Sequence, residues 1–93
     1  MQISKENMAI IIAILSKYPY QFYLFGSRAT GKARSFSDVD ICYKEEIPAE
    51  IIARIAAEFD DSDLPFKVDI VGFANMDEPF KERIQQEMVA IKP

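Results

Sequence analysis

The chain has 93 residues, of which 49% are hydrophobic and 28% are charged. This length fits one domain, residues 1–93, and the balance of residues excludes a disordered chain. The formal net charge of −4 argues against a surface that binds nucleic acid through phosphate neutralisation. The longest apolar run, Met8 to Leu15, is far shorter than the ~20 residues of a membrane span, and the N-terminus has no signal-peptide pattern. With Cys42 as the single cysteine, we expect a cytoplasmic protein that contacts neither a membrane nor nucleic acid directly.

The sequence predicts helices and strands that alternate along the chain. The expected helices span residues 5–17, 48–59 and 78–87, and the expected strands span residues 21–25, 38–43 and 66–71. Ser4 and Asp77 are suited to cap the first and the last helix, and residues 88–91 fit either a closing helical turn or a short edge strand. This order predicts an α+β (α/β) fold, with a small mixed sheet flanked by helices.

The first helix is apolar around much of its circumference, because the run MAIIIAIL is uninterrupted. One face must pack on the sheet. The rest of the apolar surface fits either deeper burial in the same chain or a contact with another subunit, in a homo- or hetero-oligomer.

Two aspartates share one face of the second expected strand. Because side chains alternate along a strand, Asp38 and Asp40 point one way while Val39 and Ile41 point toward the core. Asp69 has the same polar position between two apolar residues of the third strand. Carboxylates held this close repel one another, and a divalent cation such as Mg²⁺, which binds carboxylates together with substrate phosphates, relieves the repulsion. The three aspartates are therefore candidate metal ligands, although a turn residue at 38 and a solvent-facing residue at 40 are the plainer alternatives.

A glycine and a serine follow the first expected strand directly. Gly26 lets the backbone approach a ligand closely, and Ser27 offers an N–H and a hydroxyl to phosphate oxygens. Ser27 is also expected to cap a short helix over residues 28–30, whose N-terminus would attract an anion. Three basic residues follow, without an acidic residue among them: Arg28, Lys32 and Arg34. They form either a positive pocket for a nucleotide or a solvated loop.

Two other motifs in the sequence match only in part and are rejected. Residues 26–32 (GSRATGK) match the start of a phosphate-binding P-loop, but Ala33 stands where that motif needs a hydroxyl for Mg²⁺. The acidic turn at residues 60–63 resembles the start of a calcium loop, but the glycine and the distal glutamate that such a loop requires are absent.

The run GSRATGKARSFSDVD contains Gly-Ser, ten residues, and then Asp-x-Asp, with Asp69 as a later lone aspartate. In these motifs the chain resembles the nucleotidyltransferase superfamily of DNA polymerase β, and most closely its minimal nucleotidyltransferase (MNT) domains. The resemblance extends from the first helix through the third strand and implies the nucleotidyltransferase fold. It also implies that Asp38, Asp40 and Asp69 are catalytic and bind two Mg²⁺ ions, and that Gly26 and Ser27 hold the β- and γ-phosphates.

The resemblance further implies a reaction and a partner. A nucleoside monophosphate, AMP from ATP, would pass to a hydroxyl, namely a tyrosine of a HEPN-domain toxin for which this chain is the antitoxin. Two alternatives from other classes remain open at this stage. One is an antitoxin that neutralises its partner by binding without catalysis, and the other is a sensor that binds a nucleotide without turning it over.

Overall fold

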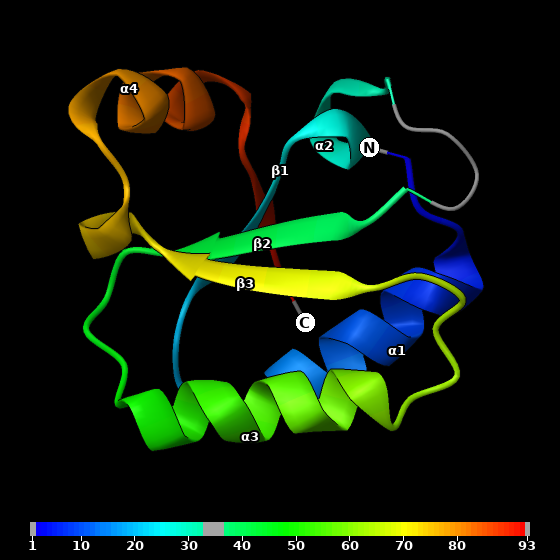
Figure 1. The fold of residues 1–93 in the computed structure, drawn as a ribbon. Helices are drawn as coiled ribbons and strands as arrows, with labels where there is room; N and C mark the ends of the chain where they lie inside the picture. Colours follow the sequence, from blue (N-terminus) through cyan, green and yellow to red (C-terminus); the bar gives the residue numbers. More distant parts are fainter. Residues whose placement is uncertain (1, 33–36, 93) are drawn as a thin grey trace.

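A computed structural model describes residues 2–32 and 37–92 of the chain (Figure 1). The helices are α1 (Lys5–Leu15), α2 (Ser27–Thr30), α3 (Ala49–Asp60), the 3-10 helix η1 (Phe73–Asn75) and α4 (Glu78–Glu87). The strands are β1 (Phe22–Phe25), β2 (Val39–Tyr43), β3 (Val68–Gly72) and β4 (Val89–Ile91). The predicted α+β class is confirmed, whereas η1 has no counterpart among the elements expected from the sequence.

The four strands form one mixed sheet in the order β3-β2-β1-β4. Strand β1 pairs antiparallel with both β2 and β4, while β2 and β3 pair in parallel. The parallel pair follows from α3, which crosses over between the two strands. The tail of the chain adopts the strand alternative, as β4 on the edge of the sheet.

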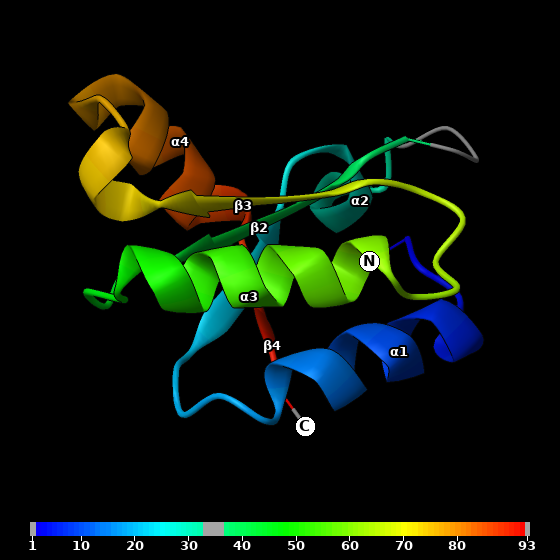
Figure 2. The ribbon, with the colours of Figure 1, turned by 60° about the horizontal axis from the view of Figure 1, so that its bottom comes forward.

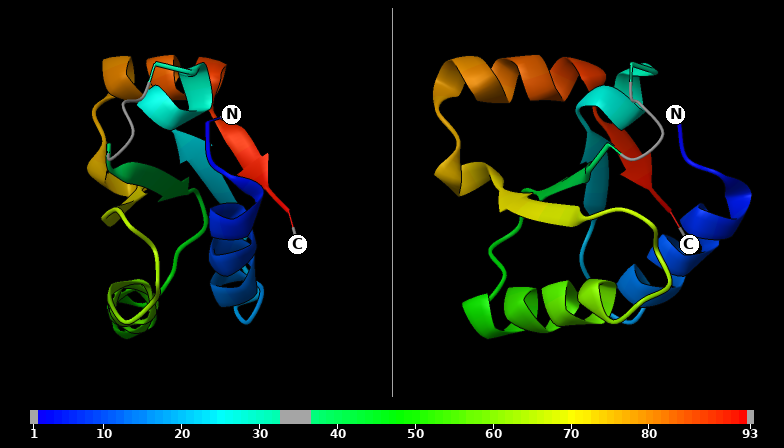
Figure 3. Two further views of the ribbon diagram at one scale, coloured as in Figure 1. Left: turned by 90° about the vertical axis from the view of Figure 1, so that its right-hand side faces the viewer. Right: turned by 45° about the vertical axis from the view of Figure 1, so that its right-hand side comes forward.

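The sheet separates two cores, because its side chains alternate between the two faces. Helices α1 and α3 cover one face and α4 covers the other (Figures 2 and 3). The larger core lies under α1 and α3 and includes Ile11, Leu24, Val39, Ile41 and Ile55. The smaller core lies under α4 and includes Phe25, Cys42, Phe73 and Ile84. Since Asp40 alternates with Val39 and Ile41 along β2, its side chain belongs to the face that α4 covers.

Hydrogen bonds from side chains fix the ends of the long helices. The Ser4 hydroxyl accepts from the amide of Asn7, and the Asp77 carboxylate accepts from the amide of Phe80, so both predicted caps are confirmed. Helix α1 ends at Leu15, two residues before the expected end. Tyr18 precedes Pro19, and a residue before proline is disfavoured in the helical conformation, so the chain leaves the helix early.

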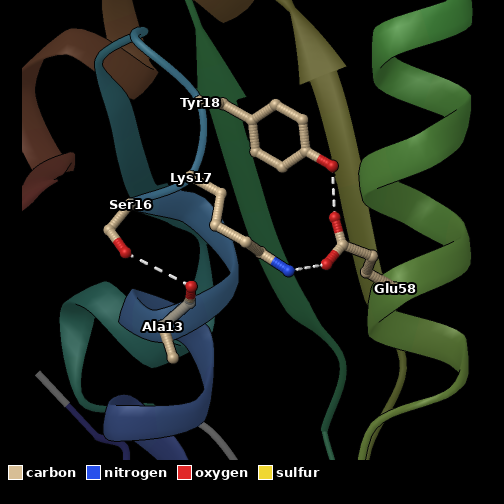
Figure 4. A network of polar contacts seen from close by, with 5 residues as sticks. All are labelled: Ala13, Ser16, Lys17, Tyr18 and Glu58. Carbon is tan, nitrogen blue, oxygen red and sulfur yellow. Dashed lines mark hydrogen bonds and ion pairs between the residues drawn. The ribbon is translucent and has the colours of Figure 1, made fainter.

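A polar cluster joins the end of α1 to α3 (Figure 4). The Lys17 ammonium and the Tyr18 hydroxyl both donate to the carboxylate of Glu58, and the Ser16 hydroxyl donates to the Ala13 carbonyl. The hydrogen bond from Lys17, followed by that from Tyr18, lowers the pKa of Glu58 below its ordinary value. This cluster joins α1 to α3, the two helices that cover one face of the sheet. None of the helices in the described ranges has the length and apolar character needed to cross a membrane.

Candidate active site

The parallel register of β2 and β3 places Asp40 directly opposite Asp69. Both side chains are half-buried and line one cleft between the sheet and α4. Asp69 therefore neighbours Asp40, as expected if the third strand lies beside the second. Two carboxylates on adjacent strands supply the hard oxygen ligands that Mg²⁺ takes in proteins.

Asp38 lies just outside β2, which begins at Val39 rather than at residue 38 as expected. Its side chain is exposed, but it is near enough to raise the pKa of Asp40. Within residues 2–32 and 37–92, no three acidic, histidine or cysteine side chains converge closely enough to hold a metal ion by themselves. The structure thus brings Asp40 and Asp69 together as a pair and leaves Asp38 at the side.

The carboxylate of Asp40 lies against the backbone of Gly26. A β-carbon added at Gly26 would come within 2.6 Å of Asp40 Oδ2, and the glycine has φ of +76°, a conformation that other residues rarely adopt. Any other residue at this position would displace the carboxylate or the turn. The requirement for glycine in the motif therefore has a direct steric cause in this chain.

Gly26 also begins α2, where the sequence placed the cap one residue later. Gly26 is the N-cap and Ser27 is the first helical residue, so the expected Ser27 cap is wrong. The Gly26 carbonyl accepts from the amides of Ala29 and Thr30, and within the described ranges the Ser27 hydroxyl makes no hydrogen bond. With four residues, α2 is too short for a large helix dipole. Any attraction for phosphate here comes from individual N–H and hydroxyl groups.

Arg28 points into the protein rather than toward the cleft. Its side chain is 6% exposed, and its guanidinium donates to the carbonyls of Ser37 (2.8 Å) and Gln2 (3.0 Å). The same group lies over the ring of Phe66, 4.4 Å from the ring centroid. These contacts connect the N-terminal segment, the turn at α2 and the approach to β2. The arrangement favours a role in positioning residues 37–38 over direct contact with a phosphate.

The two remaining basic candidates are Lys32 and Arg34. Lys32 is exposed at the end of the turn, and its amide donates to the Ser27 carbonyl. Arg34 lies outside the residues that the structure describes. Both remain predicted nucleotide-binding residues.

Helix α4 contributes a wall of the cleft that was not expected from the sequence. The cleft has a volume of about 460 Å³, and α4 lines it with Phe80, Arg83, Ile84 and Glu87. Glu87 accepts from the amide of Gly26 (3.3 Å), which holds the C-terminal end of α4 at the turn. The spacing of these residues is that of one helical face, so periodicity could have grouped them. Nothing in the sequence indicates that this face turns toward Asp40 and Asp69.

Burial and neighbouring charge disfavour the ionised form of Asp40. Desolvation, followed by the charges of Asp69 and Asp38, raises the pKa of Asp40 above its ordinary value. A cation bound between Asp40 and Asp69 would counter both effects, because it supplies opposite charge where carboxylates crowd together. The donor set and its electrostatics therefore fit a divalent metal ion.

A protein family and a named relative match nearly the whole chain. A family model described as "Polymerase beta, Nucleotidyltransferase" matches residues 9–92. The "Probable protein adenylyltransferase MntA" of Haemophilus influenzae is 36% identical over 96 residues, which cover 99% of this chain and 84% of that protein.

Two solved structures share the fold. One, described as a toxin–antitoxin with AMP-PNP, has a TM-score of 0.71 at 22% identity and covers 92% of this chain and 73% of its own. The other is described as a tri-AMPylated Shewanella oneidensis HEPN toxin in complex with an MNT antitoxin. It has a TM-score of 0.56 at 18% identity and covers 97% of this chain and 72% of its own.

We predict that Asp40→Asn stabilises the folded chain when no divalent cation is present. The raised pKa means that the ionised carboxylate costs stability at neutral pH, and the folded protein recovers that cost by taking up a proton as the pH falls. The expected gain at pH 7 is on the order of 1 kcal/mol, the scale of two like charges a few ångströms apart in water. Urea unfolding at several pH values should show that the gain in the free energy of unfolding shrinks as the pH falls below the raised pKa of Asp40. The exposed Asp63→Asn is the matched control, and an equal gain there, or a gain that grows on acidification, contradicts the explanation.

We also predict that Arg28→Met destabilises the fold by about 2 kcal/mol or more, because it removes buried charged hydrogen bonds. Arg28→Lys should recover only part of the loss, since lysine lacks the planar fork that serves two carbonyls. Thermal unfolding measures both variants, with the exposed Lys32→Met as control. If Arg28→Met unfolds at the wild-type temperature, Arg28 does not hold these segments together.

Proposed function

Because the chain belongs to the polymerase β nucleotidyltransferase family, we propose that it transfers AMP from ATP to a tyrosine hydroxyl of a partner HEPN toxin and so acts as an antitoxin. The observation that carries the proposal is the Asp40–Asp69 pair, held against the Gly26 turn in one cleft. This is the arrangement that a metal-bound nucleoside triphosphate requires, with carboxylates for the cation beside a backbone turn open to phosphates.

The nucleotide, the acceptor and the partner are supported by the relatives. The Haemophilus influenzae protein is named as a probable protein adenylyltransferase, one structural relative holds AMP-PNP, and the other pairs an AMPylated HEPN toxin with an MNT antitoxin. This chain covers most of the length of each. Since ATP is a substrate of the cell interior, the reaction is proposed to take place in the cytoplasm.

Asp40 and Asp69 would hold Mg²⁺, and Asp38 would complete the site from the approach to β2. Bound there, two Mg²⁺ ions would neutralise the charge that develops on the phosphate oxygens during an in-line displacement. Gly26 and Ser27 would hold the phosphates that leave, because the glycine lets them approach the backbone closely and Ser27 can donate from its N–H and its hydroxyl. The basic side chains of Lys32 and Arg34 would offset the charge of the same phosphates.

The proposed reaction needs no reactant other than ATP and the acceptor tyrosine. The phenolic oxygen of the acceptor forms a bond to the α-phosphorus of ATP, while the bond from that phosphorus to the bridging oxygen of the β-phosphate breaks. AMP is then esterified to the tyrosine, and pyrophosphate leaves. The phenolic proton passes to the Asp69 carboxylate and from there to water.

The test is a transfer assay with α-labelled ATP, Mg²⁺ and the protein encoded by the neighbouring gene. We expect the label on that protein, with a mass gain of one or more AMP groups on tyrosine. Asp40→Asn and Asp69→Asn should each slow transfer roughly a hundredfold or more, because each removes a carboxylate that would hold the Mg²⁺ that stabilises the transition state. Asp63→Asn, an acid-to-amide change on an exposed turn, should leave the rate unchanged.

The same assay separates the proposal from its two rivals. Neutralisation of the partner by Asp40→Asn, with no label transferred by the wild-type chain, would show that binding alone is the function. Mg²⁺-dependent ATP binding without pyrophosphate release in the presence of the partner would indicate a sensor. Either result overturns the proposed transfer.

A further inference from the structure

The cleft has two distinguishable ends on either side of Asp40. Strand β2 lies between β1 and β3 in the sheet, so Asp40 has the Gly26 turn on one side and Asp69 on the other. The hydrogen bond from Gly26 to Glu87 fixes the C-terminal end of α4 at the turn. Phe80 lies seven residues earlier on α4, which is roughly 10 Å along the helix axis. Phe80 therefore lies toward the start of α4, on the side where η1 joins α4 to β3, while its ring still reaches Phe25, the residue before Gly26.

The proposed reaction assigns different ligands to these ends. In an in-line displacement the attacking and leaving oxygens lie on opposite sides of the phosphorus. The leaving pyrophosphate belongs at the Gly26 turn, so the acceptor must approach from the side of Asp69. The ribose oxygen is an equatorial substituent of the phosphorus, so the nucleoside leaves at an angle to this line and does not occupy the path of the acceptor.

The wall at that end is aromatic and carries one cation. The ring of Phe80 is held by an edge-to-face contact with Phe25, with the ring centroids 6.3 Å apart. The guanidinium of Arg83 lies over the Phe80 ring, 5.1 Å from its centroid. Arg83 is exposed, lines the cleft, and forms no ion pair with any residue that the structure describes. Its guanidinium is thus oriented by one aromatic ring and accessible to another.

We propose that Arg83, held in place by Phe80, binds the aromatic ring of the acceptor tyrosine and presents its hydroxyl beside Asp69. This inference rests on the proposed function and assigns the acceptor site within the same cleft. A guanidinium plane stacks favourably on an aromatic face and still leaves its edges for hydrogen bonds to the acceptor backbone. Serine and threonine have no aromatic ring, so the same wall selects tyrosine over acceptors with aliphatic hydroxyls.

The kinetic test uses substitutions on α4 in the full-length chain, with the neighbouring-gene protein as acceptor and saturating MgATP. Arg83→Ala should raise KM for the acceptor about tenfold, the size expected of a stacked cation on an aromatic ring. Arg83→Lys should raise KM for the acceptor by a smaller factor. Phe80→Leu, which keeps an apolar side chain against Phe25, should raise it about as much as Arg83→Ala. Lys81→Ala is the matched control, because it removes a basic residue of α4 that pairs with Glu78 outside the cleft.

Binding of MgATP is measured for every variant by calorimetry, and an unchanged Kd is expected. If Arg83→Ala and Phe80→Leu raise the Kd for MgATP by as large a factor as the KM for the acceptor, the wall holds the nucleoside and the proposal is overturned. If they change neither quantity while the wild-type chain transfers AMP, the acceptor binds elsewhere and the proposal is again overturned.

A binding experiment tests the site without relying on catalysis. With Mg²⁺ and α,β-methylene-ATP, in which the bond that would break is replaced, N-acetyltyrosinamide is titrated into the isotope-labelled chain. We expect NMR shifts at Phe80, at the Arg83 side chain and at Val71, and none with N-acetylserinamide. Shifts centred on other residues, or equal shifts with both compounds, contradict the assignment. Since no transfer is required, a chain that fails the labelling assay can still pass or fail this one.

Discussion

Two carboxylates, Asp40 and Asp69, lie side by side because β2 and β3 pair in parallel with these residues in register. A shift of one residue in this pairing would turn one carboxylate into the core under α1 and α3, where Val39 and Ile41 are fully buried. The crossover through α3 and the packing of that core thus fix the position of the pair. The approach of Gly26 to Asp40 and the wall formed by α4 are both arranged around it.

The site concentrates like charges where water is partly excluded, and this costs stability. Asp40 has the burial and neighbouring acids that raise its pKa, and Glu87 adds a further carboxylate to the same cleft. The compensating groups lie outside it: buried Arg28 holds the flanking segments, and Glu58 joins α1 to α3 with favourable partners. Such a separation of stabilising contacts from the charged cleft is expected of a protein in which a bound ligand, rather than the fold itself, neutralises the site.

The sequence was sufficient for the parts of this protein that depend on local pattern. Alternation along β2 predicted which face carries Asp40, and the caps at Ser4 and Asp77 predicted where helices begin. It was insufficient where long-range contacts decide. Arg28 was grouped with the phosphate-binding residues on charge and proximity, whereas its environment depends on Gln2, Ser37 and Phe66, which only the folded chain brings together. The contribution of Arg83 and Glu87 to the cleft depends likewise on the placement of α4 against the sheet.

The most direct measurement is paramagnetic broadening by Mn²⁺, added in place of Mg²⁺ together with α,β-methylene-ATP to the ¹⁵N-labelled chain. The broadening marks the residues nearest the metal without any need for a partner or for turnover. We expect the amides of Gly26, Asp40 and Asp69 to broaden first, and the full effect to require the nucleotide. Asp40→Asn should abolish the broadening. Broadening centred instead on the acidic turn at residues 60–63, or unchanged in Asp40→Asn, would contradict the assignment of the metal–nucleotide site to this pair.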